Sequence, residues 1–354
     1  MSSSFSSLFS SLFSSSFSSS SCGARGLALA VSLVAAGGCG FFSEPELAAP
    51  PQVAAKPAVL DDARLEALIP AGLETVIDID VRAMRASPWT AALLETSPAQ
   101  RETKLAALGY DDAVDVDRMI FGVASQDAGA PTLVVARGRF DPTRVTDAYR
   151  DRWPGAMMDR WRGVAIASNG KDAIAVPSAR TFVSGPTAAV RRVVDRAFGD
   201  GPDLAADPAR GPVRRASVPE AVAGTTRTPA VSAAVTVSER LRAQAAPVFR
   251  LPPALRQLAL RVDLDEPQLD VRALALLDDP GAAALFARRL DALARDPGAR
   301  LALAALGLDD LASRARVTVD GARVRLETAI SADHRPETVA ALRAWLHPDV
   351  LTAP

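Results

Sequence analysis

The feature that most constrains the fold is a β-hairpin followed by an amphipathic helix, a pattern that the sequence carries four times. In the clearest copy, 316–346, apolar and polar residues alternate on both sides of Asp320-Gly321. A two-residue Asp-Gly turn fixes the register of a hairpin. The predicted cross-strand pairs are Val319 with Ala322, Val317 with Val324 and Ala315 with Leu326. A helix opening at Pro336 and Glu337 completes the unit.

The other three copies have the same order of elements. The hairpins are expected at 118–139, 164–176 and 258–275. The helix after the first of these hairpins is expected to begin near Asp141-Pro142, and the helix after the third near Asp279-Pro280. The helix after the second hairpin is expected to carry Val190, Val193 and Val194. In the 258–275 hairpin, alternation predicts Leu260 opposite Ala273 and Val262 opposite Val271.

A lone strand before a helix precedes each pair of units, at 74–80 and at 231–237. This order predicts an α+β protein of two similar halves, each an antiparallel sheet of hairpin–helix units with helices packed on one face. The predicted organisation is a low-complexity start and signal peptide (1–38), a lipid-anchored spacer (39–60), a first half (61–199), a linker (200–229) and a second half (230–354).

Charge and cysteine content exclude several classes of function. The formal net charge is −1, which provides no field that would attract nucleic acid. Both cysteines, Cys22 and Cys39, lie near the amino terminus. The rest of the chain therefore has no disulfide, no thiolate nucleophile and no cysteine metal site.

The amino terminus has the pattern of an export signal. After a Ser-rich stretch with Phe and Leu, Arg25 precedes about ten apolar residues, a length that suits a signal peptide and is too short to span a bilayer. The following Ala36-Gly37-Gly38-Cys39 resembles the lipobox of bacterial lipoproteins, and the resemblance covers only 25–50. It implies acylation of Cys39 (palmitate among the chains), attachment to a membrane and a place in the cell envelope or periplasm. Ala36 stands where these proteins usually carry leucine, so an ordinary cleaved signal is the alternative.

Recognisable catalytic motifs are absent from the sequence. The two histidines, His334 and His347, are placed at helix ends, and no nucleophile elbow, zinc-protease or phosphate-loop motif occurs. Carboxylates do cluster, at Asp78 and Asp80 and at Asp111, Asp112, Asp115 and Asp117, but the second group does not fit a calcium-binding EF-hand. We therefore expect no catalytic residue, no metal site and no cofactor.

The least ordinary surface segment is the loop expected at 150–162. It concentrates Trp, Met and Arg, the residue types enriched in interface cores. Its candidate contact residues are Trp153, Met157, Met158, Arg160 and Trp161. The alternative is that both tryptophans cover the end of the sheet core.

These patterns predict an exported lipoprotein that acts as a non-catalytic binding or structural module. Its expected partners are the membrane, through the acylated cysteine, and an envelope protein, a glycan or a small ligand. A carboxylate-dependent hydrolase is one alternative and predicts a concave site holding two of the aspartates. A lipid carrier is the other and predicts a closed apolar cavity.

Overall fold

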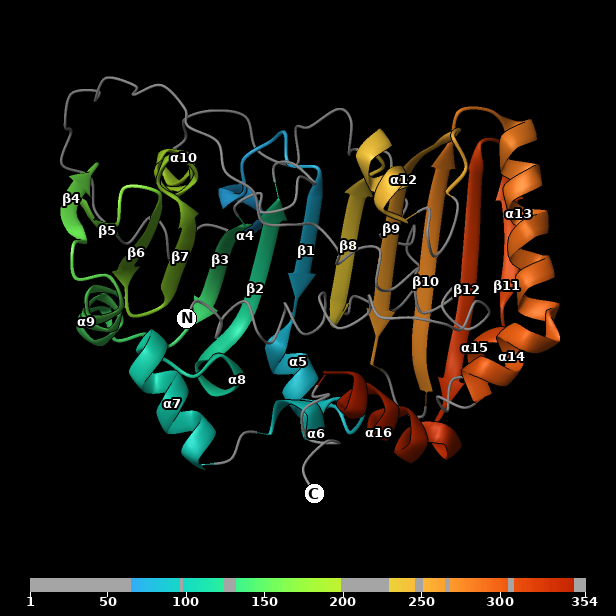
Figure 1. The fold of residues 1–354 in the computed structure, drawn as a ribbon, viewed down its shortest axis with the longest axis horizontal. Coiled ribbons are helices and arrows are strands. Elements are labelled where there is room, and N and C mark those ends of the chain that lie inside the picture. The colour runs from blue at the N-terminus through green and yellow to red at the C-terminus, as the bar shows by residue number, and fades with distance from the viewer. Residues whose placement is uncertain are drawn as a thin grey trace. The chain divides into compact units, whose positions relative to one another are not determined.

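The computed structural model describes residues 65–95, 98–123, 132–198, 229–245, 251–264, 268–304 and 309–346. They form two compact units of mixed helix and antiparallel strand (Figure 1). The N-terminal unit contains the described residues of 65–82 and 95–198, and the C-terminal unit contains 83–94 and the described residues of 229–346. The signal segment, Cys39, the spacer and most of the expected linker lie outside the described residues.

The sheet of the N-terminal unit runs in the order β1-β2-β3-β7-β6-β5-β4, with every pair antiparallel. The hairpins expected at 118–139 and 164–176 are confirmed. The strands are β1 (Thr75–Ile79), β2 (Val116–Val123), β3 (Thr132–Gly138), β4 (Met157–Trp161), β5 (Val164–Ser168), β6 (Asp172–Ser178) and β7 (Thr181–Pro186).

The sheet of the N-terminal unit buries apolar side chains on both of its faces. On one face, Val183 and its cross-strand neighbours pack against Val190, Val193 and Val194 of α10 (Thr187–Ala197), with α4 (Leu65–Leu68) beside them. Phe182 points to the opposite face, because successive side chains alternate along a strand. Its ring there contacts the rings of Tyr110 and Phe140. The core of this unit therefore continues on the second face of the sheet, where Tyr110 and Phe140 come from loops.

The helix α9 (Pro142–Arg152) begins where the sequence predicts a cap and a proline, and it lies beside α7 (Pro98–Leu108). Asp141 accepts hydrogen bonds from the backbone N–H groups of Thr143 and Arg144 at the start of α9. Gly109 ends α7 with φ of +78°. A Cβ at this position would lie 2.5 Å from the Cα of Val145, so only glycine lets α7 approach α9 this closely.

The sheet of the C-terminal unit runs in the order β11-β12-β10-β9-β8, again antiparallel. Val262 pairs with Val271 and Leu260 with Ala273, which confirms the register predicted for this hairpin. The strands are β8 (Val231–Thr236), β9 (Leu255–Asp263), β10 (Gln268–Leu277), β11 (Arg316–Asp320) and β12 (Arg323–Ser331).

The register predicted for the hairpin of β11 and β12 is wrong by two residues. The turn is formed by Gly321 and Ala322, and Val319 pairs with Val324 rather than with Ala322. Asp320 remains in the ladder opposite Arg323, a favourable pair of opposite charges. The shift of two keeps the side chains of Val317 and Val319 on the predicted face.

The helices of the C-terminal unit are α12 (Glu239–Ala245), α13 (Pro280–Arg295), α14 (Pro297–Ala304), α15 (Asp309–Ser313), the short η2 (Ala332–His334) and α16 (Arg335–Leu346). Asp279 caps α13 by accepting a hydrogen bond from the N–H of Ala282. The helix packs against β11, β12 and β10 and buries Ala283, Phe286 and Ala287. The strands and helices predicted from 255 onward are thus present in the expected order.

The segment 83–94 comes from the first half of the chain and belongs to the C-terminal unit. It contains most of α5 (Val81–Ala86) and all of α6 (Ala91–Leu94), and between them Trp89 is only 1% exposed. The indole packs with Leu269 and Ile330, and the guanidinium of Arg335 lies 5.9 Å from its ring centroid. A short segment of the first half therefore completes the core of the C-terminal unit.

Candidate interaction site at strand β4

Residues 157–161, expected within a loop, form β4, the last strand in the order of the N-terminal unit. The sequence Met-Met-Asp-Arg-Trp has no polar–apolar alternation, which is why the strand was missed. Among the described residues β4 pairs with β5 alone, with Met157 opposite Ser168 and Trp161 opposite Val164. One side of its backbone thus makes the ladder with β5, and the other is an edge.

The turn from β4 into β5 is held by a single carboxylate of α10. Arg162 and Gly163 form the two-residue turn with φ of +48° and +81°. Asp195 accepts hydrogen bonds from the indole N–H of Trp161 at 2.9 Å and from Nε of Arg162 at 2.6 Å. These two contacts stabilise a left-handed backbone conformation that is unfavourable for arginine.

The candidate contact residues separate into two groups. Trp161 is half-buried and packs against the core cluster that contains Val183. The guanidinium carbon of Arg191 lies 4.8 Å from the centroid of its indole ring. Trp153, Met157 and Met158 are exposed by 38, 67 and 49%. Trp161 therefore anchors the strand, and the other three present apolar surface to solvent.

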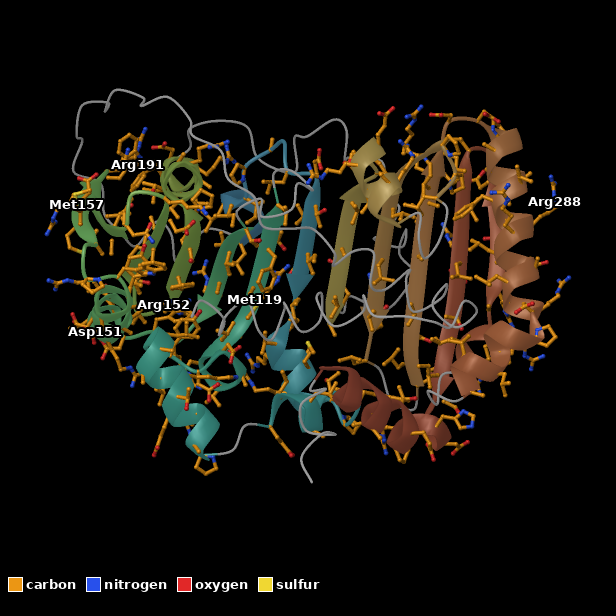
Figure 2. All side chains as sticks on the ribbon, in the orientation of Figure 1. Met119, Asp151, Arg152, Met157, Arg191 and Arg288 are labelled. Carbon is orange, nitrogen blue, oxygen red and sulfur yellow. The ribbon has the colours of Figure 1, made fainter. Side chains whose placement is uncertain are left out.

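The exposed side chains lie on both faces of β4. Asp159 forms an ion pair with Arg191 of α10 at 3.0 Å, so Met157, Asp159 and Trp161 share the α10 face. Met158 and Arg160 point to the opposite face by alternation. In Figure 2 Met157 projects away from the ribbon of β4, and Arg152 lies at α9, the helix that precedes the strand.

The charge around β4 is positive. Residues 150–162 carry four arginines against two aspartates. Asp159 is engaged by Arg191, whereas the guanidinium of Arg160 has no ion-pair partner among the described residues. Arg152 lies 5.9 Å from the ring centroid of Trp153. The exposed apolar groups of β4 are therefore bordered by cations.

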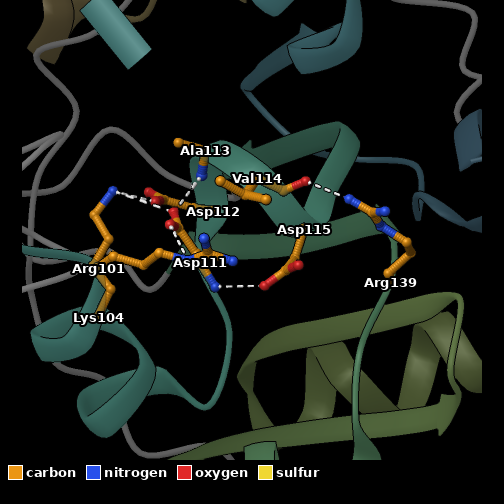
Figure 3. Close-up of polar contacts among 8 residues, drawn as sticks. All are labelled: Arg101, Lys104, Asp111, Asp112, Ala113, Val114, Asp115 and Arg139. Atoms are coloured by element: carbon orange, nitrogen blue, oxygen red, sulfur yellow. Dashed lines mark hydrogen bonds and ion pairs between the residues drawn. The ribbon is translucent and has the colours of Figure 1, made fainter. Parts of the chain in front are cut away.

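The carboxylates at 111–115 have structural partners (Figure 3). Asp111 is fully buried, caps α8 (Asp112–Asp115) by accepting from the N–H of Ala113, and lies 3.8 Å from Nζ of Lys104. Lys104 also donates to Asp112, and Asp115 accepts from the N–H of Asp111 at 2.9 Å. These contacts offset part of the negative charge of the cluster, and the cap starts the short helix before β2.

Asp78 lies in a second polar cluster, on β1. It accepts two hydrogen bonds from Arg118 of β2, at 2.9 and 2.6 Å, and Arg118 also donates to Glu66 of α4. Burial raises the pKa of the Asp78 carboxyl, although the hydrogen bonds and charge of Arg118 act in the opposite direction. The cluster links α4 to the sheet, and Asp80 follows the end of the strand.

Within the described ranges, no group of three or more His, Cys, Asp or Glu side chains is arranged to hold a metal ion. No helix in those ranges is long and apolar enough to cross a membrane. His334 ends the short η2 just before α16, where its carbonyl accepts a hydrogen bond from the Thr338 hydroxyl at 2.8 Å. His347 lies outside the described residues.

No protein-family model and no characterised protein sequence matches the chain. Three solved structures of TP0453 are similar to it, crystal forms III, IV and I, with 12, 10 and 13% sequence identity. Each match covers 80% of this chain and 98 to 99% of the TP0453 chain, with TM-scores of 0.47, 0.48 and 0.43. Likeness at this level carries no argument about function.

Proposed function

We propose that the chain is an exported bacterial lipoprotein whose folded part binds another protein of the cell envelope and catalyses no reaction. The observation that carries the binding role is the exposed apolar surface of Trp153, Met157 and Met158 around an edge strand. Large apolar side chains gathered at one place on a surface mark interaction sites, and Trp, Met and Arg are enriched in them.

The anchoring role rests on the segment Ala36-Gly37-Gly38-Cys39, which resembles the lipobox of bacterial lipoproteins. Acyl chains contribute about 0.8 kcal/mol for each buried methylene group, so two or more chains hold a protein firmly at a membrane. The Pro- and Ala-rich residues that follow suit a spacer between that anchor and the folded part.

The architecture proposed for the folded part is a pair of related halves built of hairpin–helix units. The order helix, short helix, hairpin, helix occurs at α7-α8-β2-β3-α9 and again at α14-α15-β11-β12-α16. This recurrence supports a common ancestral unit, which duplication would place once in each unit of the protein.

The anchor is tested by replacing Cys39 with serine. We expect wild type to fractionate with membranes and to carry the mass of its acyl chains, and Cys39→Ser to lose both properties. Membrane fractionation and intact-mass spectrometry measure the outcome. A soluble wild type without lipid mass would contradict the proposal.

The binding role is tested separately, with a photo-crosslinking amino acid in place of Met157 in intact cells. Val319 is the matched control, because it is an exposed apolar residue of β11 with 45% exposure. We expect a discrete crosslinked protein from position 157 and none from position 319. Equal labelling from both positions would remove the support for a binding site at β4.

A further inference from the structure

We propose that the edge of β4 that pairs with no other described strand binds an extended, acidic segment of the partner protein, so that the segment adds a strand to the sheet of the N-terminal unit. This inference deepens the proposed binding function and rests on it. An extended peptide that joins a sheet edge gains main-chain hydrogen bonds, and the side chains beside it determine which peptide is accepted.

The backbone of β4 is available for such pairing. Among the described residues it pairs only with β5, and four of its five residues are exposed. Its position is fixed before any partner arrives, because Asp195 holds Trp161 and Arg162. The preceding α9 is fixed as well, since the Tyr149 hydroxyl donates to the carbonyl of Asp172 on β6 at 2.8 Å. An edge that is already ordered loses little entropy on binding.

The side chains of β4 indicate what an added strand would meet. Met157 lies on the α10 face and Met158 on the opposite face, so apolar surface flanks the edge on both sides of the sheet. Methionine is flexible and adapts to partner side chains of different shapes. The added strand should therefore carry apolar residues on the face of Met157, whereas on the other face Met158 lies beside Arg160.

Charge selects an acidic partner. The anion of β4, Asp159, is paired with Arg191, whereas Arg160 has no ion-pair partner in the described part of the chain. Arg152 adds a second cation at the end of α9. A carboxylate directly opposite Arg160 would form a favourable cross-strand pair, and a cation there would be repelled.

The same charges disfavour a second copy of the chain paired in either of the two central registers of β4. Two β4 strands related by a two-fold axis through Asp159 would place two aspartates opposite each other. An axis through Arg160 would place two arginines opposite each other. Like charges directly across a ladder destabilise it.

The test uses the full-length lipoprotein in detergent and a soluble peptide of about seven residues in which valine and glutamate alternate. We expect the peptide to bind and to slow amide hydrogen exchange at 157–161. Arg160→Glu should weaken binding about tenfold and favour the matching valine–lysine peptide. Arg316→Glu, on the exposed edge strand β11, should leave binding unchanged.

Each other outcome overturns the inference. Two of them concern the peptides: equal binding of both peptides to wild type, and an unchanged affinity of the acidic peptide for Arg160→Glu. The other two are a different occupant of β4: a second copy of the chain, seen as dimerisation through β4, or a lipid surface, seen as binding to phosphatidylglycerol vesicles that is lost in Met157→Ser. The proposed function fails separately: it falls if position 157 crosslinks to no protein in cells, and it stands if such a crosslink persists while the acidic peptide does not bind.

Discussion

The strands β4 and β11 have comparable positions, each ending the strand order of its unit, yet they are supported differently. β11 is backed by the long helix α13, whose Phe286 is buried, and its sequence Arg-Val-Thr-Val-Asp alternates regularly. β4 is held at one end by the single carboxylate of Asp195 and presents methionine on both faces. β4 leaves the two methionines Met157 and Met158 to solvent, whereas the exposed large apolar side chain of β11 is Val319 alone.

The largest effect should come from removing the support of β11. Phe286→Ala would leave a cavity between α13 and the sheet and should lower the free energy of unfolding by about 3–5 kcal/mol. Chemical denaturation followed by circular dichroism measures the change. Leu285→Ala is the matched control, because its side chain is 45% exposed and should contribute little. Equal losses in the two variants would show that α13 does not support the edge through Phe286.

A smaller effect is expected when β4 loses its anchor. Asp195→Ala removes the acceptor shared by Trp161 and Arg162. It should lower the free energy of unfolding by about 1–3 kcal/mol, because the groups are partly exposed and water replaces part of the lost contact. Amide hydrogen exchange should accelerate at 157–163 and stay unchanged at 316–320. Asp195→Asn retains one acceptor and should show an intermediate effect. Unchanged exchange in Asp195→Ala would mean that β4 is held by its ladder with β5 alone.

The smallest effect should come from the exposed side chains themselves. Met157→Ser and Met158→Ser should change the free energy of unfolding by less than about 0.5 kcal/mol, since neither side chain is buried. Val319→Ser on β11 should be equally mild. Thermal unfolding checks all three variants. A loss of several kcal/mol at 157 or 158 would make these residues part of the core and would end the case for a binding surface.

The sequence predicted the elements that local chemistry determines. The caps Asp141 and Asp279, each followed by proline, mark the starts of α9 and α13. Alternation of apolar residues placed Val262 opposite Val271. The pairing of Asp320 with Arg323 was missed because a turn can shift by two residues while the same face stays buried.

The candidate site was predicted only in part. Composition identified Trp153, Met157 and Met158, which are exposed, but could not separate them from Trp161, which is held by Asp195 across 34 positions in the sequence. β4 itself has no periodic pattern, and a contact distant in the sequence fixes its turn. The Arg-Gly pair at 162–163 is the one local signal, since a type I′ turn needs positive φ at both central positions and glycine adopts it readily.

The burial of Trp89 affects how the protein can be divided for experiments. A recombinant fragment that starts at 229 would contain every strand of the C-terminal unit and would lack this indole. Leu269 and Ile330 would then meet water, so such a fragment should express poorly or aggregate. Deleting 83–94 from the intact chain should destabilise the C-terminal unit, to which the segment belongs, and leave the strands β1 and β2 of the N-terminal unit in place. The molecule is therefore best produced as one piece.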